Sequence, residues 1–402
     1  MKRKRIALMI FSKSMGGAES VVIEMVRHID YKKFDVFIIT NDEIQSFFFP
    51  YINKNRIFSI GRIYYLSNSV FVNKIILKIF ISLNINIQKI LIDQKIQKVE
   101  NFIKINQIQL IHSHLELDMY MLSKVKKQLG NQIKIIFTMH GSLSLAAEDI
   151  HLCGLKKKQI IDALASYDYY TSACQFFISI LKNYISIRSK YEIIENGIDF
   201  SNINCLLKKT KKTKVQHPEI VNLVYLGGER YKKGPDILLN AIDILVHKYQ
   251  ITHIHLDILR DISIGSPIFK LTQHRNIDQY ISFNGYVPSP GHLKFVYDSD
   301  IFVLPSRTEG VANSLMEAIG LEKAIVATDV GGTGEIVIDK HNGLLSSTDP
   351  HQLAIKLKQL ILNKDLRTFF SKNNKVIKSQ FDWNVIIRKY EKMYKQGLNN
   401  EF

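Results

Sequence analysis

The chain has 402 residues, of which 46% are hydrophobic and 23% are charged, enough for two or three ordinary folded cores and unlike a disordered protein. Its formal net charge of +17 suits an anionic membrane or a phosphate-bearing substrate, and a general enrichment in lysine explains the charge equally well. The lysines are dispersed, without zinc-finger spacing, a recognition-helix signature or an aromatic-basic motif, which argues against nucleic acid as a partner.

The cysteines and apolar runs bear on the compartment. Cys153, Cys174 and Cys205 contain no CxxC pair and cannot form an even disulfide framework, so they indicate ordinary thiols in a reducing compartment. The apolar run at residues 6–11 is too short for a signal peptide, and lysines interrupt residues 70–92, which favours an amphipathic helix over a membrane span. We expect a cytoplasmic protein. Residues 41–101 match no motif; packed helices are the preferred interpretation, with peripheral contact to an anionic membrane as the alternative.

Strand-like apolar runs alternate with helical patterns throughout the chain, which is typical of α/β proteins with parallel sheets. In the first half these runs lie at residues 6–11, 36–40, 110–112 and 135–138. In the second half they lie at residues 221–226, 254–259, 281–283, 301–304 and 324–327. Each half is therefore predicted to form its own doubly wound sheet.

A glycine pair follows the first strand, where Gly16 and Gly17 open a Gly-Gly-Ala-Glu segment. The next residues have the apolar spacing of a helix, at Val22, Met25, Val26 and Ile29. Glycines allow a ligand to approach the backbone and a helix N-terminus attracts anions, so the segment is a candidate phosphate site. A plain tight turn is the commoner meaning of an isolated Gly-Gly.

Histidines end the next two predicted strands, in His112-Ser113-His114 and at His140. Because alternate residues of a strand share a face, His112 and His114 could be metal ligands, catalytic groups or packed polar residues. A closed metal site requires further ligands, which no spacing supplies, so a metal is the least favoured of the three.

The domain boundary is expected at residues 206–218, which carry five lysines and almost no apolar side chains and so indicate a solvated linker. The predicted domains are residues 1–205 and 219–382. A final helix at residues 383–402, with Asp382 as a candidate N-cap, is expected to complete the first domain. Its apolar residues at helical spacing are Trp383, Ile386, Ile387, Tyr390 and Tyr394.

A basic segment follows the strand at residues 221–226, where Arg230, Lys232 and Lys233 lie among glycines. Cations at a strand end suit a diphosphate, because arginine offers a bidentate fork and lysine a point charge. A solvated charge cluster in a loop is an equally good interpretation.

Two carboxylates, Glu309 and Glu317, follow the strand at residues 301–304. A helix starting near residue 313 or 314 would place Glu309 in the loop and Glu317 in the first turn. Open α/β sheets bind ligands at that edge, and paired carboxylates could accept hydrogen bonds from sugar and ribose hydroxyls. Ser314 and Glu317 also match a capping box, so the spacing alone favours a simple helix cap for Glu317.

Taken in order, these segments resemble glycosyltransferase family 4, the retaining enzymes with the GT-B fold, over nearly the whole chain. The matching motifs are GGAE at residues 16–19, HSH at 112–114, MHG at 139–141, ENGID at 195–199, KKG at 232–234, PSRTEGVANSLMEA at 305–318 and TDVGGTGEIV at 328–337. The E-x7-E segment is the most specific. The resemblance implies two facing Rossmann-like domains, with the donor held in the cleft between them mostly by the C-terminal domain.

The resemblance also implies roles for single residues. Lys233 would bind the diphosphate in place of a metal, Glu317 the ribose hydroxyls, and Glu309 the transferred sugar near its anomeric carbon. His114 would lie close to the reacting centre, and Val287 would border the base. The remaining implied donor contacts are Gly16 and Gly17 at the phosphate, and the backbone of Gly310, Val311, Ala312, Asn313 and Ser314.

The implied reaction moves a hexose or N-acetylhexosamine from a nucleotide sugar to a glycan or lipid-linked acceptor in surface polysaccharide synthesis. A UDP-sugar is the preferred donor, and no cofactor is implied. The departing phosphate would serve as the base, so no protein nucleophile is assigned. The alternatives are a nucleotide-sugar epimerase, which generally lacks the GGAE and E-x7-E combination, and a non-catalytic protein of the same fold.

This sequence departs from the family pattern at the phosphate loop and beyond Glu317. Gly228 stands where the family usually has arginine, so Arg230 either makes that contact from two residues later or the contact is absent. Glu322 and Ala324 replace the usual glycine and proline, which leaves the local loop shape open. A DxD pattern at residues 298–300, the metal motif of another glycosyltransferase architecture, precedes its strand and predicts a helix-to-strand turn.

Overall fold

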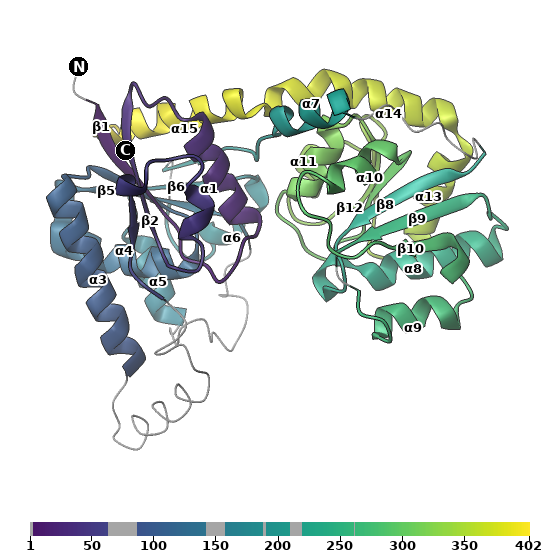
Figure 1. The fold of residues 1–402 in the computed structure, drawn as a ribbon, viewed down its shortest axis with the longest axis horizontal. Coiled ribbons are helices and arrows are strands. Elements are labelled where there is room, and N and C mark those ends of the chain that lie inside the picture. The colour runs from purple at the N-terminus through teal and green to yellow at the C-terminus, as the bar shows by residue number, and fades with distance from the viewer. Residues whose placement is uncertain (1–2, 63–86, 142–156, 188–189, 210–218, 261) are drawn as a thin grey trace. The chain divides into compact units, whose positions relative to one another are not determined.

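The computed structural model describes residues 3–62, 87–141, 157–187, 190–209, 219–260 and 262–402 (Figure 1). The chain folds into two compact units, each built around its own parallel sheet. Unit 1 comprises Met1–Ile194 with Ile386–Phe402, and unit 2 comprises Glu195–Val385. The prediction of two α/β domains with parallel sheets is confirmed.

The division between the units lies at Glu195, earlier than the linker expected at residues 206–218. The first residues of that stretch are helical, since α7 spans Phe200–Lys209. Ile203 of this helix covers Gly320, where a Cβ atom would come within 2.6 Å of the isoleucine Cδ1. This apolar contact explains why the segment belongs to unit 2.

Unit 1 has, among the described residues, a seven-stranded parallel sheet in the order β3-β2-β1-β4-β5-β6-β7. Its strands are β1 (Lys4–Met9), β2 (Phe34–Thr40), β3 (Ile57–Ser59), β4 (Leu110–Ser113), β5 (Lys134–Met139), β6 (Tyr169–Ser172) and β7 (Tyr191–Ile193). Its helices include α1 (Gly17–His28), α3 (Ile87–Asn106), α4 (Glu116–Leu129), α5 (Lys157–Ala165) and α6 (Gln175–Lys182). The four strands expected from apolar runs, β1, β2, β4 and β5, are confirmed.

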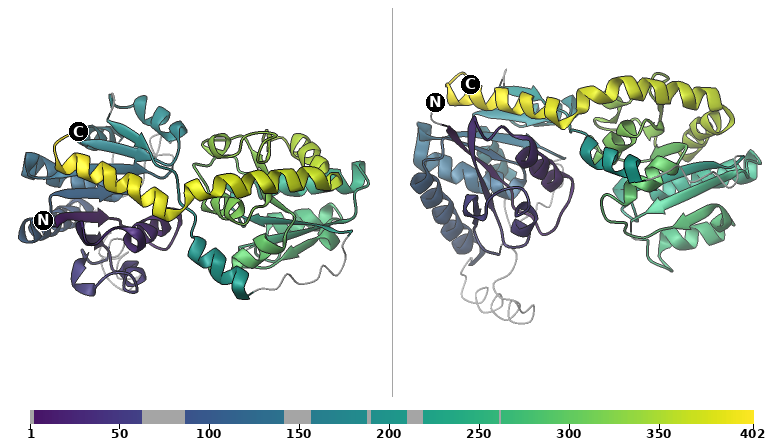
Figure 2. Two further views of the ribbon diagram at one scale, coloured as in Figure 1. Left: turned by 90° about the horizontal axis from the view of Figure 1, so that it is seen from above. Right: turned by 45° about the horizontal axis from the view of Figure 1, so that its top comes forward.

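The C-terminal helix α15 (Trp383–Leu398) contributes its later turns to unit 1. Asp382 Oδ1 accepts a hydrogen bond from the Asn384 N–H at 2.7 Å, which confirms the predicted cap. From Ile386 onward the helix lies against the unit 1 sheet (Figure 2), and Glu391 Oε1 accepts the Asp30 N–H at 2.8 Å. The predicted apolar face is buried throughout, at Trp383, Ile386, Ile387, Tyr390 and Tyr394.

Unit 2 has a six-stranded parallel sheet in the order β10-β9-β8-β11-β12-β13, counted over its described residues. Its strands are β8 (Val221–Leu226), β9 (Ile254–Leu259), β10 (Ile281–Phe283), β11 (Ile301–Leu304), β12 (Ala324–Thr328) and β13 (Leu344–Ser346). Its helices include α7, α8 (Pro235–Asp243), α9 (Pro267–His274), α10 (His292–Asp298), α11 (Asn313–Gly320), α12 (Thr333–Ile336), α13 (Pro350–Leu362) and α14 (Lys364–Ile377). All five strands expected in this half are confirmed.

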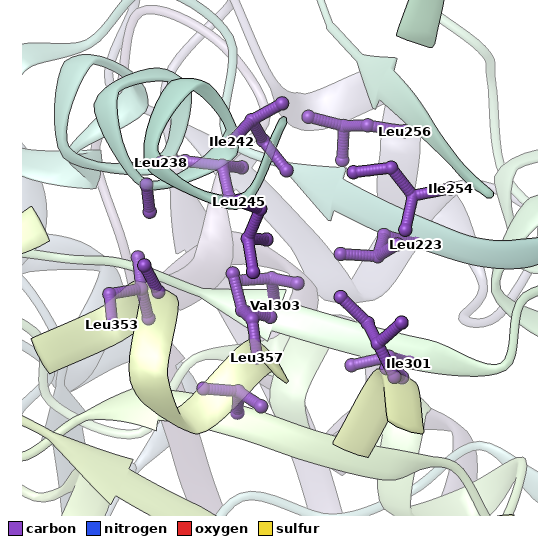
Figure 3. Packing of buried hydrophobic residues seen from close by; sticks show 14 of the residues in the cluster. Leu223, Leu238, Ile242, Leu245, Ile254, Leu256, Ile301, Val303, Leu353 and Leu357 are labelled. Atoms are coloured by element: carbon purple, nitrogen blue, oxygen red, sulfur yellow. The ribbon is translucent and has the colours of Figure 1, made fainter. Parts of the chain in front are cut away.

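The core of unit 2 fixes the strands that carry the candidate site. Leu238 and Ile242 of α8 and Leu357 of α13 belong to one buried cluster with Leu223 of β8 and Val303 of β11 (Figure 3). Burial of side chains of this size stabilises the fold by about 1.5–3 kcal/mol each. The loops that leave β8 and β11 therefore start from a rigid base.

Two other predictions concern membrane insertion and the cysteines. None of the described helices has the length and apolar content that a membrane span requires. Most of the helix expected at residues 70–92 lies outside the described residues, as does Cys153. Cys174 is buried and Cys205 is exposed, and neither forms a disulfide within the described residues.

Candidate functional site

Each sheet reverses its strand order at one point, between β1 and β4 in unit 1 and between β8 and β11 in unit 2. Open α/β sheets bind ligands outside the carboxyl ends of the strands at such a switch point. Gly16 follows β1 and His114 follows β4, while Lys233 follows β8 and Glu309 follows β11. Each unit therefore presents its predicted site residues at its own switch point.

In unit 2 the central feature is an ion pair between Lys233 Nζ and Glu309 Oε2. Lys233 ends a 3-10 turn after β8, and Glu309 lies in the loop between β11 and α11. Ser306 Oγ donates to the same carboxylate oxygen at 3.3 Å. The lysine and glutamate side chains are 19% and 15% exposed, so the pair is shielded from bulk water but still open to a ligand.

Glycines permit the close approach of the loops around this ion pair. Gly234 has φ of +67°, and a Cβ atom there would lie 1.9 Å from the Pro305 carbonyl oxygen. Gly331 has φ of +59°, and a Cβ atom there would lie 1.7 Å from the Glu309 carbonyl oxygen. Only glycine fits these two positions. A side chain there would collide with the neighbouring backbone, and the positive φ would strain the backbone of the substituted residue.

A Gly331→Ala substitution is therefore expected to destabilise the protein by about 2–4 kcal/mol and to displace the Glu309 loop. Gly265→Ala is the matched control, because Gly265 has φ of +83° with open space around it, so alanine adds only the strain of the left-handed conformation, roughly 1 kcal/mol. Urea denaturation of both variants measures the difference. Equal losses of stability would show that contact with the Glu309 backbone does not matter.

Arg307 connects the Glu309 loop to the segment 231–236, which contains Lys233. Its guanidinium forms a bidentate pair with Asp236 at 2.8 and 2.5 Å, and Nη1 also donates to the Tyr231 carbonyl oxygen at 2.8 Å. Its backbone N–H donates to the Lys232 carbonyl oxygen at 2.8 Å. The hydrogen bond from Arg307 lowers the pKa of Asp236. These bonds hold the turn that presents Lys233.

Gly228, which stands where the family usually has arginine, adopts a backbone conformation that favours glycine. Gly228 has φ of +59°, a conformation that arginine would adopt only with strain, and the Tyr225 hydroxyl donates to its carbonyl oxygen at 3.2 Å. Arg230 stands at the start of the turn Tyr231–Lys233 with an exposed side chain. The Arg230 carbonyl oxygen accepts the Lys233 N–H at 2.8 Å. Its guanidinium forms no hydrogen bond or ion pair within the described part of the chain, and the exposed side chain is accessible to a ligand.

The capping-box interpretation of Glu317 is wrong. α11 begins at Asn313 with Ala312 as its N-cap, and no side chain caps it, so Ser314 lies inside the helix. Glu317 Oε2 instead lies 3.0 Å from His292 Nε2, at the start of α10. The sequence did not predict this role of His292, because the separation of His292 and Glu317 along the chain matches no helix, strand or motif spacing.

The backbone that precedes α11 is held by a residue whose role was also not foreseen. Asn196, from the ENGID motif, donates through Nδ2 to the Val311 carbonyl oxygen at 2.9 Å and to Asn313 Oδ1 at 3.0 Å. Gly310 and Ala312 are buried in the same loop. The residues whose backbone is expected to contact the donor, 310–314, therefore form a fixed loop beside Glu309 and the first turn of α11.

Val287 and the DxD pattern lie on either side of α10. Val287 is half-buried in the loop after β10, and its Cγ1 would lie 3.2 Å from a Cβ atom on Gly291. The DxD residues form a turn between α10 and β11, where Asp300 Oδ2 accepts the Asn222 N–H at 2.9 Å. The interpretation of DxD as a helix-to-strand turn is confirmed.

In unit 1 the glycine pair lies at the start of α1, as expected. Gly17 is its first residue, and the Gly16 carbonyl oxygen accepts the Ser20 N–H at 3.1 Å and its hydroxyl at 2.8 Å. Val22 and Met25 are buried on the predicted face. The helix N-terminus is thus directed to the switch point between β1 and β4.

The three histidines expected at the strand ends of unit 1, His112, His114 and His140, divide into a packed one and a pair. His112 is fully buried between the Tyr394 hydroxyl at 2.7 Å and Thr138 Oγ1 at 2.5 Å, so it is a satisfied core residue. His114 Nδ1 lies 3.0 Å from His140 Nε2, whereas His114 Nε2 is buried without a hydrogen-bond partner among the described residues. Among all the described residues, no three histidine, cysteine, aspartate or glutamate side chains lie close enough together to hold a metal ion.

Burial lowers the pKa of all three histidines, and that of His140 falls to about 4. An unfolded histidine titrates near 6.5, so between these pH values the unfolded chain binds more protons than the folded one. We expect the free energy of unfolding to fall as the pH drops from 6.5 to 4, by on the order of 2–3 kcal/mol for His140. In His140→Gln, denaturant titrations should show a shallower fall, and a pH dependence identical to that of the wild type would contradict the expectation.

Two family models match separate stretches of the chain. The model described as Glycosyltransferase Family 4 matches residues 15–202, and the model described as Glycosyl transferases group 1 matches residues 221–363. Together they cover most of the sequence. The chain belongs to glycosyltransferase family 4.

The glycosyltransferase is 26% identical over 305 residues to an uncharacterised glycosyltransferase of Methanocaldococcus jannaschii, covering 74% of this chain and 78% of that protein. It is 34% identical over 109 residues to N,N'-diacetylbacillosaminyl-diphospho-undecaprenol alpha-1,3-N-acetylgalactosaminyltransferase of Campylobacter jejuni, covering 27% of this chain and 29% of that protein. HepE of Anabaena, solved in complex with UDP, has a TM-score of 0.73 at 14% identity, covering 98% of this chain and 100% of HepE. The structural likeness establishes the fold, which is that of GT-B enzymes.

The glycosyltransferase keeps the turn after α11 despite its departure from the family pattern. Glu322 adopts φ of +58°, the left-handed conformation that the family's usual glycine provides without strain. Lys378 directly follows α14, and its Nζ lies 2.6 Å from the Glu322 carboxylate. This ion pair stabilises the turn. Ala324 then begins β12 in register with Ile301. The strand is unaffected by the missing proline.

Proposed function

We propose that this glycosyltransferase moves a hexose or an N-acetylhexosamine from a UDP-sugar, with retention of configuration, to a glycan or lipid-linked acceptor. The observation that carries the proposal is the Lys233–Glu309 pair at the β8/β11 switch point, with Glu317 on the helix α11 that follows the Glu309 loop. A cation paired with one carboxylate, followed by a second carboxylate on the next helix, suits a ligand that carries both phosphate and hydroxyl groups.

The donor would contact this site in the order implied by the family pattern. Lys233 would bind the diphosphate, Glu309 the sugar near its anomeric carbon, and Glu317 the ribose hydroxyls. Val287 would border the base. The backbone of residues 310–314 would face the sugar and phosphates, while Gly16 and Gly17 would approach the phosphate from unit 1.

Charge balance supports a contribution from Arg230. The diphosphate carries two negative charges at the least, and the single charge of Lys233 is already shared with Glu309. Arg230 is exposed three residues away in the chain, and an arginine binds phosphate oxygens through two parallel hydrogen bonds. Side chains could thus supply the positive charge for which other enzymes use a metal ion.

Chemistry at this site would consist of leaving-group stabilisation. The bond between the anomeric carbon and the diphosphate breaks, the acceptor oxygen attacks from the same face, and a phosphate oxygen takes the acceptor proton. Fixed cations favour the departing diphosphate, and the Glu309 carboxylate favours positive charge on the sugar in the transition state. His114, whose Nε2 has no hydrogen-bond partner among the described residues, would lie near the reacting sugar.

The names and bound ligands of similar proteins support the choice of substrates. HepE was solved with UDP and with UDP-glucose, and the Campylobacter relative is named for transfer of N-acetylgalactosamine to an undecaprenol-linked sugar. A UDP-sugar and a lipid-linked acceptor in surface polysaccharide synthesis are the corresponding assignments for this chain. With such an acceptor, the protein would act in the cytoplasm, in peripheral contact with the inner face of the membrane where the lipid-linked acceptor is held.

Thermal-shift measurements with a panel of UDP- and GDP-sugars test the donor assignment. A ligand that binds only the folded state raises its stability, so one UDP-sugar should raise Tm by the largest amount. The same sugar nucleotide should produce a much smaller shift in Glu317→Ala. Stabilisation by GDP-sugars alone, or by none of the panel, would contradict the proposal.

A further inference from the structure

His292 has no assigned role, yet among the described residues it forms the one ion pair of Glu317, the predicted ribose-binding residue. Its Nε2 lies 3.0 Å from Glu317 Oε2. The histidine side chain is 15% exposed, whereas that of Glu317 is 30% exposed. One carboxylate oxygen therefore faces a largely buried imidazole, and the carboxylate is still accessible to a ligand.

The histidine itself is held in place by packing. It is the first residue of α10, a helix whose Leu293 and Val296 are buried in unit 2. A glutamate side chain has three rotatable bonds, and binding a ligand through it requires that they be fixed. The largely buried imidazole of His292 already contacts Oε2 of Glu317, and this contact restricts the three rotatable bonds before the ligand binds.

We infer that His292 is a positioning residue that pre-orients Glu317 for the nucleotide ribose. The inference rests on the proposed donor role of Glu317 and adds a residue that the family pattern did not supply. His292 acts through the glutamate: it holds Oε2, which leaves Oε1 and the remaining lone pairs to accept hydrogen bonds from ribose hydroxyls.

The same segment connects the ribose residue to the border of the base site. Val287 Cγ1 would lie 3.2 Å, and the Pro288 carbonyl oxygen 3.1 Å, from a Cβ atom on Gly291. The loop therefore folds back on itself immediately before His292. A change in the His292–Glu317 contact should affect recognition of the nucleoside, while the diphosphate contacts at Lys233 stay as they are.

A double-mutant cycle on UDP binding tests the inference, with Kd measured by calorimetry for the wild type, His292→Ala, Glu317→Ala and the double variant. His292→Ala should weaken UDP binding about tenfold, whereas in the Glu317→Ala background the same change should alter Kd less than about twofold. Inorganic pyrophosphate, which has no ribose, should bind wild type and His292→Ala equally. His292→Gln should recover most of the affinity, because its amide can donate to the same oxygen.

The control variant is His351→Ala, which replaces an exposed histidine on α13 of the same unit. This variant should bind UDP with the affinity of the wild type. Wild-type UDP affinity in His292→Ala, an equal loss for pyrophosphate, or additive losses in the double variant would each overturn the inference. If His292→Ala does not fold, His292→Gln takes its place in the comparison. A folded His292→Gln that binds UDP no better than Glu317→Ala would also overturn the inference. An unchanged UDP affinity in Glu317→Ala would contradict the proposed ribose contact itself.

Discussion

Replacing Lys233 with alanine is expected to lower kcat/KM for the sugar donor by about 10²–10³-fold, the range found when one electrostatic donor is removed from an active site. Two effects act in the same direction. The leaving diphosphate loses its fixed cation, and Glu309 loses its ion-pair partner while remaining 15% exposed beside the donor. An uncompensated carboxylate next to a diphosphate is repulsive at short range.

Initial-rate measurements and UDP titration together check this expectation, because Lys233 should contribute to binding as well as to turnover. Lys232→Ala is the matched control, since the adjacent side chain is exposed and only its backbone oxygen, which the substitution retains, bonds to Arg307. The control should stay within about twofold of the wild type. Similar losses in both variants would mean that the loop contributes diffuse positive charge and that Lys233 has no specific role.

Replacing Glu309 with glutamine is expected to lower kcat by about 10²–10³-fold without weakening UDP binding. Glutamine has nearly the same shape, so the loop held by Gly331 and by the Gly332 N–H bond to the Glu309 carbonyl oxygen at 3.3 Å should persist. The negative charge that would favour a cation-like sugar is lost. Because Lys233 is then no longer paired with a carboxylate, UDP should bind as well as before or more tightly.

The separation of kcat from UDP affinity distinguishes this role from a structural one. Glu229→Gln, in the loop after β8, is a suitable control because it removes a carboxylate outside the Lys233–Glu309 pair. A Glu309→Gln enzyme with wild-type kcat would exclude the carboxylate from the chemistry. Parallel losses of UDP affinity and stability would instead indicate that the residue only holds the loop.

The sequence was a good guide to the strands with continuous apolar runs. β8, β9 and β11 match their predicted bounds because most of their side chains are buried in a parallel sheet: β11 is buried at every residue, and β8 and β9 at four of their six. Short strands such as β7, with the half-buried residues Tyr191–Ile193, carry no such signal. They become strands because a neighbour in the sheet supplies hydrogen-bond partners, which local sequence does not record.

For the candidate site, the sequence predicted that Lys233 and Glu309 follow the strands β8 and β11, as the structure has them, but it did not predict their contact. Glu309 and Lys233 were found through the order of the motifs, yet their ion pair joins residues 76 positions apart. His292, at the start of α10, and Asn196 were missed as partners because a single histidine or asparagine at such a position gives no sign of the residue it contacts. The boundary at Glu195 was missed because α7 is attached to unit 2 by apolar packing that lysine content does not reveal.

Donor hydrolysis by the purified wild-type protein tests the proposed function most directly, with all products identified. With the UDP-sugar that stabilises the fold most, we expect free sugar and UDP in equal amounts, at a rate that Lys233→Ala lowers by about 10²–10³-fold. Conversion of that donor into a second UDP-sugar would instead identify an epimerase. Binding without any conversion, with or without acceptor, would contradict transfer at the Lys233–Glu309 site.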